Sequence, residues 1–269
     1  MKEEIAKLIE SVRSKNPLVH HITNTVTIND CANATLAIGG SPVMADSPEE
    51  AASMVKLAQA LVINMGTLTE STFTAMVQAA KEANRQHIPV VLDPVGVGAT
   101  TFRNEKAEEF LQTVHPQIIR GNASEISSLI GEEVRTRGVD AGKVDEDAAV
   151  LASRAAQLLK SVVVVSGPVD YISDGNQTAG IQNGHPILTK VTGTGCMATS
   201  LIGNFAGITN NYFQAAIAGI SVMGISGERA HRYFGETPVG TGSFHVRLMD
   251  EISLMNSQTW QKEVKLIEV

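Results

Sequence analysis

Short apolar runs alternate with amphipathic segments along most of this 269-residue chain, and that alternation restricts the fold more than any other feature. The runs ALVINMG (60–66) and SVVVVSG (161–167) are apolar almost throughout, which is typical of strands buried on both faces of a sheet. Segments 71–86 and 146–160 are typical of helices. A strand–helix alternation of this kind predicts an α/β fold with a mostly parallel central sheet and helices on both faces.

Two stretches depart from the alternation. Residues 132–147 are polar and contain glycine, which predicts a surface excursion. Between residues 170 and 190, the pattern predicts short antiparallel strands, with turns at Asp174-Gly175 and Asn183-Gly184. We find no linker, low-complexity stretch or internal repeat, so the chain is predicted to form one domain over residues 1–269.

One helix start carries an explicit capping signal. Segment 47–60 is predicted to be a helix with Ser47 as its N-cap and Glu50 three residues later, which is the spacing of a capping box.

The charge pattern excludes some classes of partner. The formal net charge is −7, and lysine and arginine form no runs, so a nucleic-acid groove or a surface for anionic membranes is not expected. An acidic enzyme can still bind ATP through Mg²⁺, backbone N–H groups and a few placed cations. The charged N-terminal segment is not typical of a signal peptide, and the most apolar stretch (215–225) is too short to span a bilayer. A cytoplasmic location is therefore predicted.

The segment VTGTGCMATS (191–200) is the first of four candidate functional segments. Gly193 and Gly195 precede a predicted helix, and such a turn lets backbone N–H groups approach an anion at the positive end of the helix dipole. A glycine-rich helix entrance without a ligand is the alternative. Cys196 falls in the first helical turn, where the pKa of a thiol is expected to be lowered. Burial as a small apolar side chain is the alternative for Cys196.

Two further segments place acidic side chains after predicted strands. Asp93 ends the strand in VVLDPVGVGAT (90–100), so its carboxylate is expected at the carboxyl edge of the sheet, near Mg²⁺ or a phosphate-bound water. Capping of the next turn is the alternative role for Asp93. In RGNASE (120–125), Asn122 and Glu125 have the spacing of a capping box, and Glu125 could also hold a magnesium-bound water. Arg120 leaves the same strand and could pair with phosphate.

The fourth candidate consists of three strand-end segments with polar or small residues. These segments are HHITNTVTIND (20–30), SPVMAD (41–46) and INMGTL (63–68). They are expected to line a pocket for a small, weakly polar substrate. The histidines in and near these segments have no spacing typical of a metal site.

Together these segments make the chain resemble the hydroxyethylthiazole kinases, a family within the ribokinase-like superfamily. The resemblance is carried by NPLVHHITNTVTINDCANATLAIGGSPVMAD, LVINMGTL, LDPVGVGAT, IIRGNASEI and VTGTGCMA, and it covers nearly the whole chain. It implies a ribokinase-like fold without a separate lid domain. It also implies an enzyme that uses ATP and Mg²⁺ to phosphorylate the hydroxyl group of a methyl-hydroxyethyl-thiazole, a salvage step of thiamine biosynthesis.

The resemblance also implies roles for individual residues. It places Met44, Gly193, Asn24 and Gly66 at the thiazole, Arg120, Ser166, Thr194 and Gly195 at ATP, and Asp93 and Glu125 at Mg²⁺. Cys196 stands where most ribokinase-like enzymes carry an aspartate in a GAGD-type turn, and it is expected to act as a modest general base. Cysteine in this turn is a feature of the thiazole kinase branch.

The resemblance implies a homotrimer with active sites at the subunit interfaces. Three other readings remain open on sequence grounds. The chain could be another ribokinase-like kinase, acting on hydroxymethylpyrimidine or a sugar. It could be a nucleotide-dependent dehydratase of hydrated nicotinamide nucleotides, which shares the fold and the glycine turn. It could also be a nucleotide-binding regulator without catalytic activity.

Overall fold

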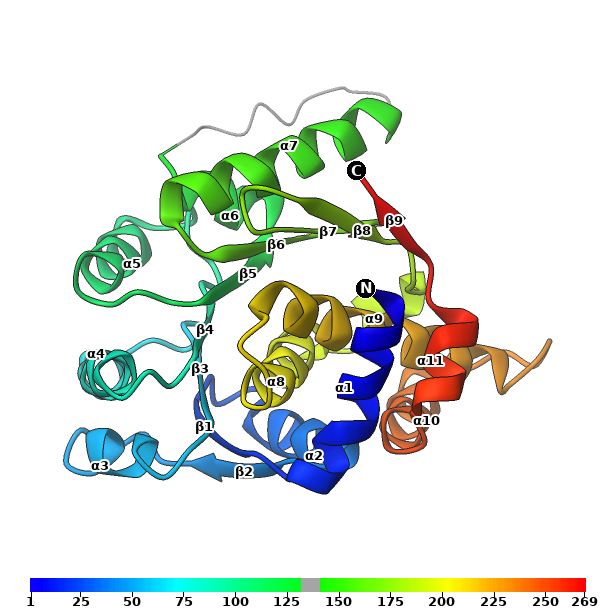
Figure 1. The fold of residues 1–269 in the computed structure, drawn as a ribbon, viewed down its shortest axis with the longest axis horizontal. Coiled ribbons are helices and arrows are strands. Elements are labelled where there is room, and N and C mark those ends of the chain that lie inside the picture. The colour runs from blue at the N-terminus through cyan, green and yellow to red at the C-terminus, as the bar shows by residue number, and fades with distance from the viewer. Residues whose placement is uncertain (132–140) are drawn as a thin grey trace.

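The strands of the described residues form one nine-stranded sheet at the centre of the molecule (Figure 1). In this computed structural model, the backbone is described for residues 1–131 and 141–269, and the side chains for 1–131 and 148–269. Within these residues the strand order is β2-β1-β3-β4-β5-β6-β7-β8-β9. The strands are β1 (Leu18–Ile22), β2 (Ser41–Met44), β3 (Ala60–Asn64), β4 (Val90–Asp93), β5 (Ile118–Asn122), β6 (Val162–Ser166), β7 (Asp170–Ser173), β8 (Thr178–Ile181) and β9 (Leu266–Glu268). Strands β1 to β6 run parallel, and β7, β8 and β9 extend the sheet in antiparallel fashion.

Helices cover both faces of the sheet (Figure 1). One face carries α3 (Ala51–Val55), α4 (Glu70–Arg85), α5 (Thr101–Thr113), α6 (Ala123–Leu129) and α7 (Ala141–Leu159). The other face carries α1 (Lys2–Lys15), α2 (Ile28–Ile38), α8 (Thr194–Ala206), α9 (Tyr212–Arg232), α10 (Thr241–Ser253) and α11 (Ser257–Glu263). Successive side chains of a strand point to opposite faces. Accordingly, Val62 joins the core under α8 and α9, whereas Leu61 and Ile63 join the core under α4. The predicted α/β fold is therefore confirmed.

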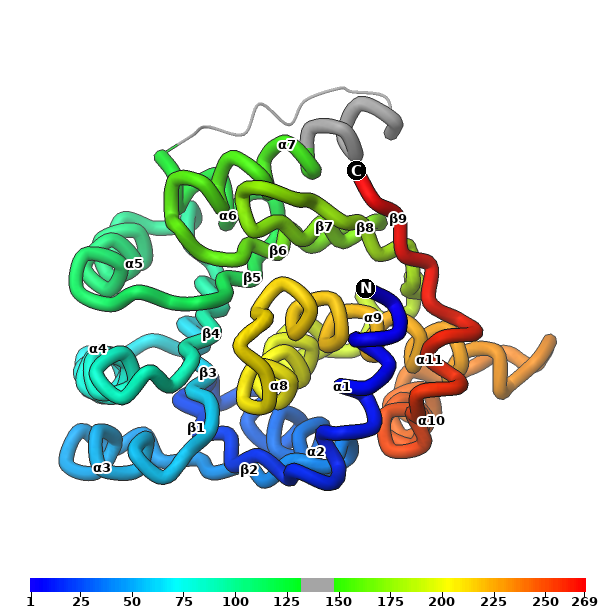
Figure 2. The backbone as a smooth tube through the Cα atoms, in the orientation of Figure 1, coloured from blue at the N-terminus to red at the C-terminus, as the bar shows by residue number. Residues whose placement is uncertain are grey.

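The two ends of the chain meet on one side of the sheet. Figure 2 shows α1 beside α11, and these two helices pack against each other. Trp260 of α11 is fully buried and donates a hydrogen bond from Nε1 to Ser221 Oγ of α9 at 2.7 Å. After α11 the chain forms β9, which pairs with β8.

Some sequence-based boundaries were wrong. The helix predicted over 47–60 is the short α3, which starts at Ala51, and its N-cap is Glu50. The Ser47 hydroxyl instead contacts the Glu49 carboxylate, so it caps nothing. The turn at Asp174-Gly175 does join β7 to β8, but Asn183-Gly184 leads into a 3₁₀ helix, η1 (Pro186–Lys190), and not into another strand.

The predicted surface excursion over 132–147 falls partly outside the described residues. Residues 132–140 are not described, and residues 141–147 belong to α7.

Among the described residues, no helix is both long enough and apolar enough to cross a membrane.

Candidate active site

Polar side chains from neighbouring strands gather at the carboxyl edge of the parallel sheet. The last residue of β3, Asn64, lies in register with the last residue of β4, Asp93. One step along the sheet, Asn122 of β5 is in register with Ser166 of β6. Parallel strands bring their carboxyl ends to one edge, where ligands of open α/β sheets bind. The apolar residues of these strands lie in the core, and the polar residues at their carboxyl ends line one side of the candidate site.

Asp93 is a fully buried carboxylate. One of its oxygens accepts hydrogen bonds, and the other has no partner among the described residues. Its Oδ2 accepts hydrogen bonds from Thr199 Oγ1 at 2.7 Å and from Asn64 Nδ2 at 3.0 Å. Its Oδ1 is buried without a partner among the described residues. Burial raises the pKa of Asp93 to about 6, although the Arg120 guanidinium 3.8 Å from Oδ2 acts against that rise. A buried acceptor without a partner fits a magnesium-bound water.

Cys196 lies beside this carboxylate, in the first turn of α8. Its Sγ accepts hydrogen bonds from Asn24 Nδ2 and Asn64 Nδ2, each at 3.3 Å. Asn24 also donates to Asn64 Oδ1 at 3.0 Å, so the two amides and the thiol form one cluster. The other cysteine, Cys31, is buried, and burial raises the pKa of its thiol to about 11. Cys196 is therefore the cysteine with both access and hydrogen-bond donors.

The start of α8 provides an uncapped helix N-terminus above the sheet edge. Gly193 is its N-cap, with φ +86°, and no side chain caps the helix. The backbone N–H groups of the first turn have no partner within a helix, so they remain available to an anion. A Cβ on Gly195 would lie 2.7 Å from Arg120 Nη1, so glycine is what lets the arginine approach this turn. The glycine turn predicted at the start of this helix is thus present, with a cation beside it.

We expect Gly193→Ala to lower the free energy of unfolding by about 1–3 kcal/mol. Alanine is strained at this φ, and its Cβ would lie 2.6 Å from Thr27 Cγ2. Urea unfolding of the variant measures the effect. Gly242→Ala is the matched control, because that glycine also lies near the start of a helix but has open space around it. An equal stability of the two variants would contradict the expectation.

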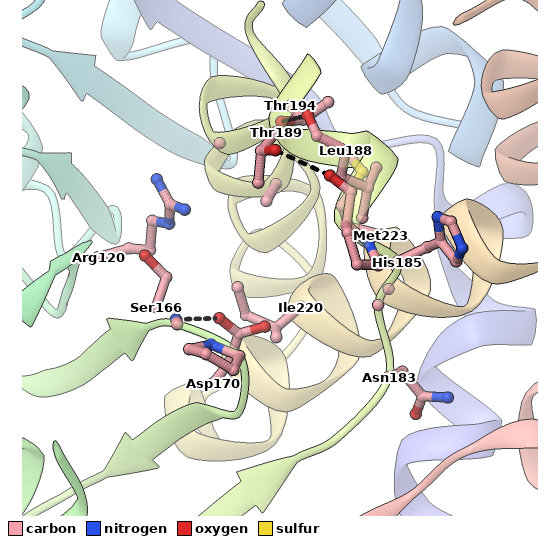
Figure 3. A pocket seen from close by; sticks show the side chains of 17 residues that line it. Arg120, Ser166, Asp170, Asn183, His185, Leu188, Thr189, Thr194, Ile220 and Met223 are labelled. Atoms are coloured by element: carbon pink, nitrogen blue, oxygen red, sulfur yellow. Dashed lines mark hydrogen bonds between the residues drawn. The ribbon is translucent and has the colours of Figure 1, made fainter. Parts of the chain in front are cut away.

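A cavity of about 610 Å³ opens next to the α8 turn (Figure 3). Arg120, Ser166, Thr194 and Gly195 are among its lining residues, so the cavity brings together the four residues predicted to bind ATP. Its other lining residues include the apolar side chains Leu188, Ile220 and Met223. This volume lies within the usual range for small-molecule and cofactor pockets. The cavity therefore combines a cation and backbone N–H groups with apolar surface, which are the kinds of contact that a nucleotide uses.

Glu125 has the structural role that its spacing predicted. Asn122 Oδ1 accepts from the Glu125 N–H at 2.9 Å and Glu125 Oε2 accepts from the Asn122 N–H at 2.8 Å, which completes a capping box at α6. Oε1 accepts from the Gly96 N–H at 2.9 Å. The carboxylate is close enough to Asp93 for its charge to raise the pKa of that residue. Each Glu125 oxygen keeps a lone pair that a metal-bound water could use.

The site combines an uncapped helix start, a buried carboxylate and a reachable thiol, and comparison with known proteins decides the family. The family model for the hydroxyethylthiazole kinase family matches residues 9–258. The chain belongs to that family. It is 48% identical to a hydroxyethylthiazole kinase of Ruminiclostridium cellulolyticum over 270 residues, which cover 99% of this chain and 98% of the relative. A hydroxyethylthiazole kinase of Methanosarcina mazei is 45% identical, with 97% and 98% covered.

Solved structures agree with the family and the fold. The hydroxyethylthiazole kinase protein of Pyrococcus horikoshii has a TM-score of 0.89 and 40% identity, with 99% of each chain covered. An ADP/ATP-dependent NAD(P)H-hydrate dehydratase of Bacillus subtilis has a TM-score of 0.62 at 14% identity, covering 93% of this chain and 96% of that one. The second likeness concerns the fold alone. As a member of the hydroxyethylthiazole kinase family, the chain is a phosphotransferase.

The residues predicted to contact the thiazole do not all reach the cluster in the same way. Asn24 belongs to it directly, and Gly66 follows β3, where its N–H donates to Asn64 Oδ1 at 2.9 Å. Gly193 adjoins the cluster through Thr27, which hydrogen-bonds to Asn24 Oδ1 at 3.1 Å. Met44 is half-buried at the end of the edge strand β2, in register with His21. Its role at the substrate remains a prediction.

Sequence reasoning did not single out three residues of this kinase-family site, although Asn64 and Thr199 fall within the candidate segments 63–68 and 191–200. Asn64 connects Asp93 to Cys196, Thr199 donates to Asp93, and Asp170 lines the cavity. Asn64 had a signal, because it is a polar residue at the end of an otherwise apolar strand run. Thr199 and Asp170 had none that distinguished them from ordinary helix and hairpin residues.

Proposed function

We propose that this member of the family transfers the γ-phosphoryl group of ATP to the hydroxyl group of a methyl-hydroxyethyl-thiazole. The observation that carries the proposal is the position of the α8 turn. Its thiol joins the Asn24–Asn64 cluster, whereas Thr194 and Gly195 line the nucleotide-sized cavity. An alcohol held at the cluster and a phosphate held at the turn would therefore meet at Cys196. Met44, Gly66 and Gly193 are the proposed remaining contacts of the thiazole.

The phosphates would lie against the α8 turn and the Arg120 guanidinium beside it. The transition state of phosphoryl transfer is loose, so catalysis depends on positioning and on charge stabilisation rather than on covalent chemistry. Orientation of the two reactants can supply about 7–11 kcal/mol. Backbone N–H groups from Thr194 to Cys196 can bind the transferring group without reorganisation. The fixed turn therefore performs the largest share of the proposed catalysis.

Asp93 and Glu125 are the residues proposed to hold Mg²⁺ through its water ligands. Mg²⁺ typically keeps several waters and binds few protein carboxylates. The described residues contain no group of three or more His, Cys, Asp or Glu side chains that could form a metal site by themselves, which suits an ion held mainly by nucleotide phosphates. When bound, the ion would neutralise charge on the phosphates. The free Oδ1 of Asp93 is the acceptor that such a water would meet.

Cys196 is the proposed acceptor of the alcohol proton. An alcohol that attacks a loose centre loses its proton late, so this base contributes modestly. The two amide N–H groups that donate to Sγ fix the position of the sulfur at the end of the substrate cluster.

We expect Cys196→Ala to lower kcat by about 10- to 100-fold without abolishing it. Cys196→Asp should keep or raise activity, since a carboxylate is ionised at neutral pH and can accept from the same amides. Steady-state assays of both variants, together with Cys31→Ala as the control, check this. A folded Cys196→Asp protein without activity would exclude the base role.

The direct test is to incubate the protein with the thiazole alcohol, ATP and Mg²⁺ and to look for the phosphorylated thiazole by mass spectrometry. The same assay with hydroxymethylpyrimidine separates the two kinase activities. Recovery of absorbance from hydrated nicotinamide nucleotide tests the dehydratase activity. Phosphorylation of hydroxymethylpyrimidine in preference to the thiazole alcohol would overturn the proposal.

We further propose that the chain is a single kinase domain and assembles as a homotrimer in the cytoplasm, with the active sites at subunit interfaces. Support for the assembly comes from α2 and α10, which pack together and leave large apolar side chains exposed. Val26, just before α2, and Val246 of α10 are 64% and 67% exposed. Val26 is two residues from Asn24, so a subunit seated there would border the substrate end of the site. Sedimentation velocity of the protein and of Val246→Glu tests this, and a monomeric wild-type protein would refute it.

A further inference from the structure

Arg103 is a cation at the carboxyl edge of the sheet that the proposed chemistry does not use. It lies in the first turn of α5, and α5 packs beside α4 on the same face of the sheet (Figure 1). The Arg103 side chain is half-buried. Its Nη1 donates to the backbone carbonyls of Met65 and Val95, the latter at 2.8 Å, and its Nη2 donates to the carbonyl of Gly66 at 2.6 Å. One guanidinium therefore binds the loop after β3 and the loop after β4 at the same time.

The loop after β3 belongs to the substrate end of the site. The Gly66 N–H donates to Asn64 Oδ1 at 2.9 Å, and a Cβ on Gly66 would lie 2.8 Å from Asn24 Cβ, so the backbone packs directly against Asn24. Arg103 binds the carbonyls of Met65 and Gly66, which belong to the two peptide groups that flank Gly66. A shift of these peptide groups would displace the Asn24–Asn64 cluster that holds the thiol.

The loop after β4 begins at Asp93 and is bound on two sides. Val95 accepts from Arg103, and the Gly96 N–H donates to Glu125 Oε1 at 2.9 Å. A Cβ on Gly96 would lie 3.2 Å from Arg103 Cδ, so the stem of the arginine lies against the backbone at this point. The loop is therefore held between Arg103 and Glu125, directly after the buried Asp93 carboxylate.

We propose that Arg103 is a positioning residue that fixes the loops after β3 and β4 together and so holds the alcohol-binding cluster at reacting distance from the α8 turn. The inference rests on the proposed function in taking the Asn24–Asn64 cluster as the site of the alcohol. A displacement of about 1 Å between reacting groups can cost roughly 100-fold in rate. The planar guanidinium binds several carbonyls in fixed directions, which a lysine ammonium does not reproduce.

Steady-state kinetics of Arg103→Lys, with the alcohol and ATP varied in turn, test the inference. Lysine keeps the charge but not the planar fork, so kcat should fall by about 10- to 100-fold and the KM for the alcohol should rise several-fold. The KM for ATP should stay within about threefold of the wild-type value. The reason is that, among the described residues, those lining the 610 Å³ cavity include none from either loop. A loss of stability alone would lower the amount of active protein and leave both KM values unchanged.

Arg13→Lys is the matched control, because Arg13 also donates to backbone carbonyls but away from the site. Its guanidinium binds the carbonyls of Ala37, Ser253 and Met255, near the C-terminal ends of α2 and α10. This variant should lose stability as Arg103→Lys does and should keep the wild-type kcat and KM values.

Chemical rescue separates the shape of the Arg103 side chain from its charge. Ethylguanidinium at millimolar concentration, far below denaturing levels, should restore part of the kcat of Arg103→Ala, whereas ethylammonium carries the charge without the fork and should not. Hydrogen exchange of segments 65–68 and 94–98 is a readout that needs no turnover. Exchange there should be faster in Arg103→Lys than in the wild-type protein or in Arg13→Lys.

Two results would overturn the inference. One is an Arg103→Lys protein whose kinetic constants, or whose hydrogen exchange in the two loops, match those of the wild-type protein. The other is an equal loss of kcat in Arg103→Lys and Arg13→Lys, which would show a general effect on the fold. Failure of the wild-type protein to phosphorylate the alcohol would refute the proposed function instead, and hydrogen exchange would still decide whether Arg103 fixes the two loops.

Discussion

Asp93→Asn should lower kcat/KM at least 100-fold and, at pH 7, raise the free energy of unfolding by up to about 3 kcal/mol. The activity falls because an amide cannot supply the negative charge proposed to face magnesium-bound water. The stability rises because burial has moved the pKa of Asp93 from 3.8 to about 6. Two pKa units correspond to roughly 3 kcal/mol of unfavourable interaction in the ionised native state. The neutral amide has no such unfavourable free energy, and its oxygen can still accept hydrogen bonds from Thr199 and Asn64.

The pH dependence of the same variant gives an independent check. Because the folded pKa of Asp93 is raised, its contribution to stability is fully present below pH 3.8 and is lost as the pH rises through about 6. The stability difference between Asp93→Asn and wild type should therefore be largest above pH 7 and shrink toward pH 4. Urea unfolding at pH 4.5, 6 and 7.5 measures it. Asp174→Asn is the control. The pKa of the Asp174 carboxyl is lowered by hydrogen bonds from Gln177 and nearby backbone N–H groups, so its replacement should not stabilise the protein. An Asp93→Asn protein less stable than wild type at every pH would contradict this account.

The carboxylate is retained at a cost in stability, and its neighbours reduce that cost without removing it. Asn64 and Thr199 donate to one oxygen of Asp93, while the other oxygen has no partner among the described residues. A residue selected for stability alone would be expected to have both oxygens satisfied. The incomplete pairing is what a ligand-bearing site requires, because the ligand completes it.

The sequence was sufficient to locate most of the site, for one physical reason. Parallel strands with apolar interiors leave their last residues at a common edge, so Asp93, Arg120 and Glu125 could be assigned to one region from the sequence. Ser166 was implied only by the family resemblance. The glycine turn at 193–195 could also be predicted from the sequence, because two glycines directly before a helix are a local feature of the chain. The structure places Gly193 at a positive φ, a conformation that glycine adopts readily.

The features that sequence reasoning missed depend on contacts between distant segments. Asn64 becomes a site residue only because the fold places Cys196 of α8 beside the end of β3, and the two residues are 132 positions apart in the sequence. The short helix α11 and the strand β9 were not predicted, and they are held by Trp260 against α9 and by pairing with β8. At Ser47 a strong local signal was overridden, because the hydroxyl contacts Glu49 and the helix begins later. Long-range packing is not encoded in spacing, so such residues could not be found from one sequence.

Arg120→Ala should weaken ATP binding at least 100-fold and lower the free energy of unfolding by about 3–5 kcal/mol at pH 8. Arg120 is largely buried, lies 3.8 Å from Asp93, and acts on Asp170 as well. Its guanidinium lowers the pKa of both carboxyls against the effect of burial. Removing it leaves the buried Asp93 carboxylate and the partly buried Asp170 carboxylate without their cation, which raises both pKa values further.

The loss of stability in Arg120→Ala should therefore depend on pH in a defined direction. Above the raised pKa values both carboxylates remain ionised and unpaired, so the defect is greatest near pH 8. As the pH falls below about 6 they take up protons, and the variant should approach the wild-type stability. Arg120→Lys is the matched control: it keeps the charge but not the planar fork, so it should restore most of the stability while ATP binding stays weak. Unfolding of Arg120→Ala with the same pH profile as wild type would show that Arg120 does not balance the two carboxylates, and the cavity would then need another source of affinity for phosphate.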